Sequence, residues 1–318
     1  MHWNRRSFVK IASALATTVI ATNAAAQRFS PAFRSKTRDA ELKSILENAT
    51  ALDIDTKALS INNVAATPID LANIILAALD KPLADNRTMA LAHRADALLR
   101  TIRKDNKDYF AFTTVSAPPF DAAEKARLKK MFLECSVGAS HKAEIARVVA
   151  QILKPSAQSR YAEVSQITSV PWYVIGAIHY READLNFLGH LHNGDPLDHK
   201  TVNVPAGRPN GPWPPVPFDP RVAWRLSAVD ALSEFASITN WSVERMLYGF
   251  EAYNGFGYRS HHINSPYVWS YSQYYVQGGY PSDNVWSDTY VSKQAGLGLL
   301  IKALSDADPA NVKLSFES

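Results

Sequence analysis

One carboxylate is unusual because it occupies the apolar face of a predicted helix. The segment that begins at Pro171 predicts a helix, and one face of it carries Ile175, Ile178, His179 and Glu182. A charged group on such a face is costly to bury unless it is paired or neutralised. A carboxylic acid that keeps its proton can serve as a general acid. Glu182 is therefore the first candidate catalytic residue.

Two further polar residues follow in a segment rich in Gly, Pro, Asn and Asp. Residues 190–211 are typical of a loop, and the TVNV stretch in their middle favours a short β-hairpin. Such a hairpin would hold Asp195 and Thr201 across from the helix end that carries Glu182. An acid with an Asp and a Thr can hydrolyse a glycosidic bond, because one group protonates the leaving oxygen while the others position a water.

This order of an acid, a polar turn, and Asp and Thr six apart resembles the catalytic arrangement of phage-type lysozymes. The interval from Glu182 to Asp195 is longer here than in that family. The stretch Glu251–Tyr258, EAYNGFGY, resembles the helix-ending signature of lytic transglycosylases and goose-type lysozymes. Together the two motifs place roughly residues 140–306 in the lysozyme-like superfamily by resemblance.

The resemblance implies a mainly α fold, in which a lysozyme-like helical domain with a small β-hairpin follows a helical N-terminal region. The implied activity is cleavage of peptidoglycan between its sugars. Glu182 would be the acid, and Asp195 and Thr201 would position the attacking water. Because the superfamily signature faces the cleft, Tyr253 and Asn254 are implied substrate contacts.

Further candidate contacts with substrate come from the aromatic C-terminal part of the chain; they are Tyr258, Arg259 and Trp269. Arg259 would meet a peptide carboxylate or a phosphate. Trp269 belongs to the run Asn264–Tyr280, whose rings would form a platform for sugars, since apolar sugar faces stack on aromatic rings. Core packing is the alternative for the same rings.

Each candidate also has a structural interpretation. Glu182 would form an ion pair with Arg181 or Arg208. Asp195 follows Asn-Gly and precedes Pro, and an Asp in such a turn usually accepts hydrogen bonds from its own backbone. Lytic transglycosylases use a single Glu, so that Asp195 would matter little. A non-catalytic wall-binding protein would need only the aromatic cleft.

The histidines are the remaining candidates for chemistry. His190 and His192, with His179, Glu182 and His199 nearby, contain ligand types that a zinc hydrolase acting on wall peptide would use. Their spacing fits no standard motif, and no HExxH occurs. We therefore expect no metal and no cofactor, with these histidines in hydrogen-bonding roles.

The N-terminus predicts export. Arg5 and Arg6 are followed by Phe and Lys, then by the apolar run Ile11–Ala21 and three alanines before Gln27. This pattern is typical of a twin-arginine signal peptide over residues 1–26, and it predicts a periplasmic or secreted protein. The whole chain has a net charge of +4. Removing residues 1–26 takes away three basic residues and no acid, which leaves 31 basic and 30 acidic residues. Bulk charge therefore gives no case for nucleic-acid binding.

The predicted partner is peptidoglycan, and no stretch after the signal suits a membrane span. Residues 27–140 are predicted to form the amphipathic helices of an accessory region. The catalytic domain is predicted at 141–306, and a polar, frayed tail at 307–318. Asp288 is predicted to begin the last helix. The single cysteine, Cys135, excludes an internal disulfide.

Overall fold

Helices make up most of the chain that the computed structural model describes, which comprises residues 31–54, 68–81, 86–106, 116–235, 238–282 and 285–317. The α-helices are α1 (Pro31–Ala51), α2 (Pro68–Leu79), α3 (Asn86–Asn106), α4 (Ala122–Glu134), α5 (Lys142–Ile152), α6 (Pro155–Thr168), α7 (Trp172–Ala183), α8 (Pro220–Leu232), α9 (Val243–Asn254), α10 (Pro266–Trp269) and α11 (Leu297–Ala307). Short 3₁₀ turns are η2 (Ala139–His141), η3 (Ser233–Phe235) and η4 (Phe256–His261). β1 (Gly279–Ser282) and β2 (Val285–Ser287) form an antiparallel pair. The predicted mainly α fold with a small β-hairpin is confirmed.

The hairpin is not where the TVNV stretch predicted it. Residues 201–204 are irregular, and the paired strands lie about 80 residues further on. The backbone N–H groups of Val202 and Asn203 both donate to the carboxylate of Asp195, at 2.8 Å each. These donors are therefore used by a side chain and do not take part in a strand ladder.

Local capping signals account for several helix ends. The Asp121 carboxylate accepts from the N–H of Glu124 at the start of α4, and the Ser242 hydroxyl accepts from Arg245 at the start of α9. α9 ends at Asn254 because Gly255 follows with φ of 94°, a conformation that favours glycine. The stretch Glu251–Tyr258, which resembles a helix-ending signature, therefore does contain the end of a helix.

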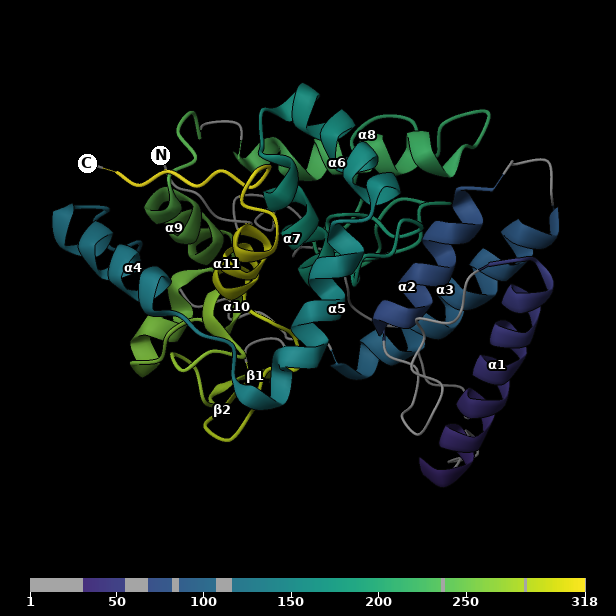
Figure 1. The fold of residues 1–318 in the computed structure, drawn as a ribbon, viewed down its shortest axis with the longest axis horizontal. Coiled ribbons are helices and arrows are strands. Elements are labelled where there is room, and N and C mark those ends of the chain that lie inside the picture. Colours follow the sequence, from purple (N-terminus) through teal and green to yellow (C-terminus); the bar gives the residue numbers. More distant parts are fainter. Residues whose placement is uncertain are drawn as a thin grey trace, which may run out of the picture.

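α7 is the central helix of the fold, and every residue from Tyr173 to Ala183 is buried. It packs against α5, α6 and α11, which surround it in Figure 1. A Cβ on Gly176 would lie only 2.7 Å from the side chain of Ile152 on α5. The glycine therefore lets α7 approach its neighbour closely. A helix enclosed on all sides places its polar residues in the interior.

The helices before residue 140 divide between two sides of the molecule. α1, α2 and α3 pack on one another, whereas α4 packs against α9 and α11 on the far side (Figure 1). One hydrophobic core runs from Ile45 to Val312. Residues on both sides of position 140 contribute to this core. Within the described residues, no helix is both long and apolar enough to cross a membrane.

The last helix begins at Leu297, so the predicted start at Asp288 is wrong. The Asp288 carboxylate accepts from the indole N–H of Trp286 at 2.7 Å and so belongs to the end of the hairpin. The side chains of this helix that lie in the core include Leu297, Leu300, Ile301 and Leu304.

The tail after α11 is packed against the fold, and the prediction that it frays is wrong. Val312 is fully buried, and Ser315 accepts a backbone hydrogen bond from Val243 at the start of α9. Glu317 pairs with Lys125 of α4 and Arg245 of α9. The tail is thus held by one apolar anchor and two ion pairs that its polar composition did not indicate.

Candidate active site

Glu182 lies in the last turn of α7 and is only 3% exposed. The hydroxyl of Tyr267, on α10, donates to Glu182 Oε1 at 2.8 Å. Asp184, two residues after Glu182, adopts a left-handed backbone conformation and terminates α7. The predicted burial of this carboxyl is therefore confirmed, and one of its oxygens is oriented by a tyrosine.

Tyr267 is the residue of this site that the sequence analysis did not single out. It is buried at the second position of α10, and its ring lies 6.1 Å from that of Tyr253. The guanidinium of Arg181 lies over the Tyr267 ring, 5.0 Å from its centroid. The only sequence signal was membership of the aromatic run 264–280, in which many tyrosines are equivalent.

The signature residues Tyr253 and Asn254 end α9 beside this tyrosine. The Tyr253 ring stacks on Phe235 at 5.3 Å, and Asn254 is half-buried. The Asn254 amide donates to the hydroxyl of Ser265, which directly precedes α10, at 3.5 Å. The structure therefore brings Glu182, Tyr253 and Asn254 to one junction of α7, α9 and α10.

Two arginines were alternatives as ionic partners of Glu182. Arg181 donates to the carbonyl of Gln294 at 3.2 Å, in addition to its position over Tyr267. Arg208 pairs with Asp230 of α8 at 2.8 Å. Both guanidinium groups therefore have contacts of their own away from the carboxyl.

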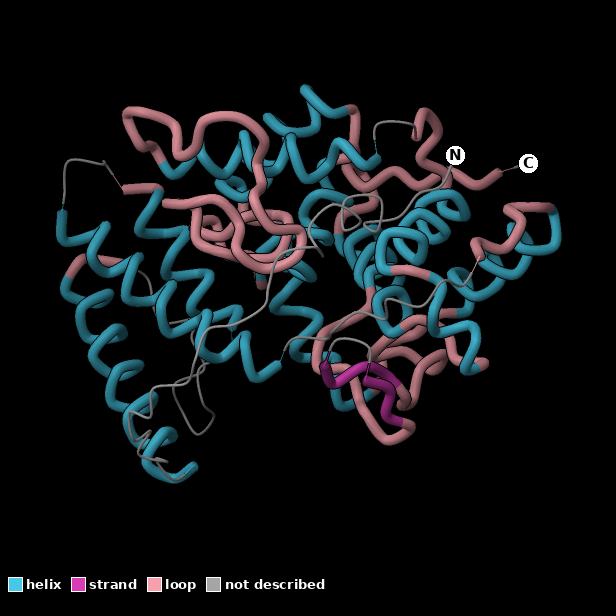
Figure 2. The backbone as a smooth tube through the Cα atoms, turned by 180° about the vertical axis from the view of Figure 1, so that it is seen from behind, coloured by secondary structure: helices cyan, strands magenta, loops and turns pink. Residues whose placement is uncertain are grey.

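Asp195 lies in the irregular connection from α7 to α8, residues 184–219, drawn in pink in Figure 2. Gly194 brings this loop against the end of α7, since a Cβ there would lie 3.0 Å from the carbonyl oxygen of Glu182. The loop therefore lies against the helix end that carries Glu182, but without the predicted hairpin. The Asp195 side chain, however, accepts hydrogen bonds from Asn193, Val202 and Asn203 within its own loop.

Thr201 organises the same loop. Its hydroxyl donates to the carbonyl of Pro205 at 2.5 Å and accepts from the N–H of Arg208 at 2.9 Å. The only hydroxyl proton and one of the two acceptor lone pairs are therefore used within residues 201–208. The geometry favours a structural role for this threonine.

The hydrogen bonds to Asp195 make it a stabilising carboxylate. Burial alone would raise its pKa, but the donors of Asn203 and Val202 outweigh that effect and hold the pKa below the ordinary value of 3.8. The carboxylate therefore contributes stability above that ordinary value. The contribution is lost as the pH falls through 3.8 towards the folded-state pKa.

We expect Asp195→Asn to lower the free energy of unfolding by about 1–3 kcal/mol at pH 7. The amide NH₂ of the new side chain would face N–H groups of the loop, which need an acceptor. At pH 3 the difference in the free energy of unfolding between the wild type and this variant should be smaller. Urea unfolding at both pH values measures this. Asp198→Asn, an exposed Asp in the same loop, is the control. A gap that is unchanged or larger at pH 3 contradicts the assignment.

Charged side chains of α3 hold the first part of this loop. Arg103 pairs with Asp184 at 2.6 Å, and both side chains are nearly buried. The amide of Gln294 donates to the other oxygen of Asp184 at 2.9 Å. The end of α7, two residues beyond Glu182, is therefore fixed by a buried ion pair from the N-terminal region.

A second pair acts one turn earlier on α3. Arg100 pairs with Asp96 at 2.6 Å and donates to the carbonyls of Leu188 and Gly194. The amide of Asn186 donates to Asp96 at 2.6 Å. α3 therefore sets the course of the loop that follows Glu182.

The histidines of the loop bind protein groups. His190 Nε2 donates to the carbonyl of His199 at 2.8 Å, and its Nδ1 lies 2.8 Å from the Ser227 hydroxyl. Burial lowers the pKa of His190 to about 4, so it is neutral at pH 7. His192 lies 2.8 Å from Asp230 on α8. These contacts fasten the loop to α8.

Elsewhere, His179 on α7 lies 3.0 Å from the hydroxyl of Tyr161, and burial lowers its pKa to about 3. Among the described residues no three His, Cys, Asp or Glu side chains are grouped to hold a metal ion. Burial also raises the pKa of the Cys135 thiol to about 11, which makes it a poor nucleophile.

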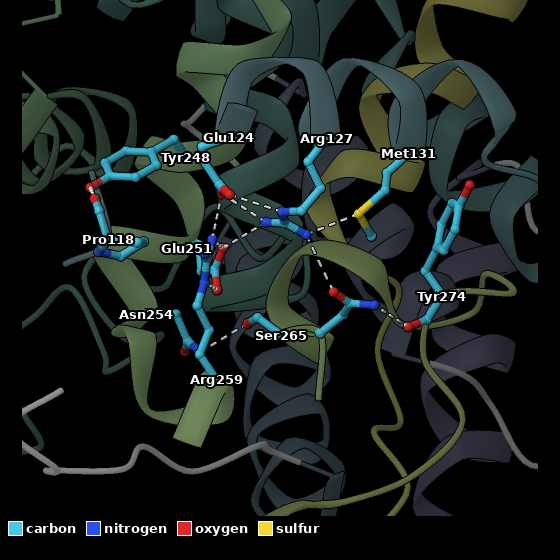
Figure 3. Close-up of polar contacts among 11 residues, drawn as sticks. Pro118, Glu124, Arg127, Met131, Tyr248, Glu251, Asn254, Arg259, Ser265 and Tyr274 are labelled. Atoms are coloured by element: carbon cyan, nitrogen blue, oxygen red, sulfur yellow. Dashed lines mark hydrogen bonds and ion pairs between the residues drawn. The ribbon is translucent and has the colours of Figure 1, made fainter. Parts of the chain in front are cut away.

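Four predicted substrate contacts require correction. Tyr253, Trp269 and Tyr258 are 7%, 1% and 2% exposed, and rings so enclosed offer no face for a sugar. Trp269 packs in the main core, and Tyr258 packs edge-on against Tyr280. Arg259 binds the carboxylates of Glu251 and Glu124, so its charge is already neutralised (Figure 3).

The candidate active site is therefore the junction of α7, α9 and α10. Comparison of the chain with protein-family models, curated proteins and solved structures found no match.

Proposed function

We propose that this protein is an exported enzyme that cleaves the glycan strands of peptidoglycan, using Glu182 as its single acid. The observation that carries the proposal is the buried Glu182 carboxyl held by Tyr267. Tyr253 and Asn254, whose motif resembles that of lytic transglycosylases, end a helix at the same junction. A buried carboxyl beside tyrosine and amide groups suits proton transfer to a sugar oxygen.

The surroundings of Asp195 and Thr201 favour single-acid cleavage over hydrolysis. A base that activates water needs an oxygen directed at that water. Both oxygens of Asp195 accept hydrogen bonds from its own loop, and the Thr201 hydroxyl is used twice. The lytic transglycosylase mechanism dispenses with both residues.

The proton then cycles through one residue. Glu182 gives its proton to the glycosidic oxygen as the bond from that oxygen to the anomeric carbon breaks. A hydroxyl of the same sugar attacks the anomeric carbon and returns a proton to the Glu182 carboxylate. No water is consumed, and the product has an anhydro end. The Tyr267 hydroxyl stabilises the carboxylate between the two transfers.

Export rests on the twin arginines Arg5 and Arg6, which lie outside the described residues. A wall substrate on the far side of the inner membrane is consistent with that route.

Mass spectrometry of a peptidoglycan digest tests the proposal. The purified chain should release fragments with anhydro ends, and Asp195→Asn should give the same products. Reducing ends would show that water is the nucleophile and would return Asp195 and Thr201 to catalytic roles. Cut peptide stems would indicate a peptidase. Binding without cleavage would identify a wall-binding protein.

A further inference from the structure

Four charged side chains form a compact network between α4 and the end of α9. Glu124 and Arg127 come from α4, Glu251 from α9, and Arg259 from η4 (Figure 3). Two acids and two arginines make a neutral set. The four residues belong to regions that are more than a hundred positions apart in the sequence.

The arginines use their planar groups in two-pronged contacts. Arg259 Nε and Nη2 donate to the two oxygens of Glu251 at 2.7 and 2.6 Å. Arg127 Nε and Nη2 donate to the two oxygens of Glu124 at 2.9 and 2.8 Å. Arg259 Nη2 also reaches Glu124 at 2.6 Å, which joins the two pairs. Such paired contacts fix orientation as well as distance.

Stability alone is a weak reason for such a network. The side chains of Glu124 and Glu251 are only 10% and 4% exposed. Removing buried charges from water offsets much of their mutual attraction, and apolar side chains of similar size often stabilise as well. What an ionic network adds to apolar packing is a set of directional contacts, which constrain how its groups are oriented.

These contacts fix the backbone on both sides of Asn254, a residue of the proposed active site. Glu251 precedes Asn254 by one helical turn, and Arg259 follows it across the turn made by Gly255. Fixing both sides of this turn fixes the Asn254 amide, which reaches Ser265 at the start of α10.

The network also reaches the segment that leads into α10. Arg127 Nη1 lies 3.5 Å from the side-chain oxygen of Asn264, whose amide donates to the carbonyl of Tyr274 at 3.0 Å. Asn264 stands three residues before Tyr267, the partner of Glu182. The end of α9 and the segment that leads into α10 are therefore in contact with the same network.

We propose that α4 is a positioning element of the glycan-cleaving site, with Glu124 as the residue that holds Asn254 in place through Arg259. The proposal rests on the proposed function. It gives α4 a part in catalysis that acts through Arg259 and the end of α9.

A double-mutant cycle between Glu124→Gln and Asn254→Ala tests it, with soluble peptidoglycan strands as substrate. Glu124→Gln should lower kcat/KM by about tenfold in the wild-type background and by less than about twofold in Asn254→Ala, because the group it positions is then absent. A purely structural role would give the same factor in both backgrounds.

Arg245→Gln is the matched control, because it breaks the pair with Glu317 at the opposite end of α9. It should lower the melting temperature without the loss of kcat/KM. Glu124→Asp keeps the charge and serves if Glu124→Gln does not fold. Its cycle should show the same coupling, because the shorter side chain cannot span both arginines.

Hydrogen exchange of the full chain without substrate gives a second readout. Amides of residues 252–268 should exchange faster in Glu124→Gln and not in Arg245→Gln. Additive effects on kcat/KM, or unchanged exchange, overturn the positioning role. A wild-type protein that releases no glycan fragments contradicts the proposed function, whereas an active wild type with an equally active Glu124→Gln contradicts only this inference.

Discussion

Glu182→Gln is expected to lower turnover on peptidoglycan by at least about 10²-fold with little change in glycan binding. The amide has the shape of the acid but no proton to transfer to the glycosidic oxygen. Its oxygen can still accept from the Tyr267 hydroxyl, so the local structure and the melting temperature should be preserved. Turnover, binding and thermal unfolding of the purified variant measure the three quantities.

Two variants make this result specific. Glu244→Gln changes another buried glutamate, whose carboxylate accepts from the backbone of Glu317 at the opposite end of α9. It should keep wild-type turnover. Tyr267→Phe should reduce turnover by about tenfold, because the carboxyl loses one neutral donor while the acid remains. A folded and fully active Glu182→Gln protein would eliminate the glycosidase mechanism.

Arg103→Met should lower the free energy of unfolding by about 3–5 kcal/mol. Asp184 would keep its negative charge in a nearly buried position, with the neutral Gln294 amide as a remaining donor. The loss arises from this uncompensated charge and exceeds the value of the ion pair itself. Urea unfolding at pH 7 gives the measurement.

The double variant Arg103→Met with Asp184→Asn should recover a large part of this loss. Asparagine removes the charge, tolerates the left-handed backbone of residue 184 and still offers an oxygen to Gln294. Lys302→Met breaks the exposed pair with Asp306 and should cost less than about 1 kcal/mol. Equal losses for Arg103→Met and Lys302→Met would show that the buried pair does not stabilise the chain.

Features that depend on neighbours in the sequence were predictable. Asp121 and Ser242 cap helices because a short side chain can reach N–H groups two or three residues ahead. Gly255 ends α9 because it adopts a positive φ at no steric cost. The apolar spacing around Glu182 predicted its burial for the same local reason, since residues three and four apart share a helix face.

Local sequence signals failed where another hydrogen bond used a group that the predicted strand or helix cap required. The TVNV stretch has the composition of a strand, but Asp195 takes the N–H groups that a strand would pair. Asp288 has the type of a helix cap, but Trp286 already donates to it. In both cases the residue type permits two hydrogen-bonding arrangements.

The sequence by itself determined a mainly helical chain with a buried carboxyl at the end of one helix. Only the tertiary structure decided which residues meet that carboxyl. Tyr267 lies 85 positions after Glu182, and Glu124 and Arg259 are 135 positions apart. Contacts over such separations depend on which helix faces pack together. Many tyrosines and arginines have the same local sequence pattern. Only the packing of the helices decides that Tyr267 meets Glu182 and that Arg259 meets Glu124.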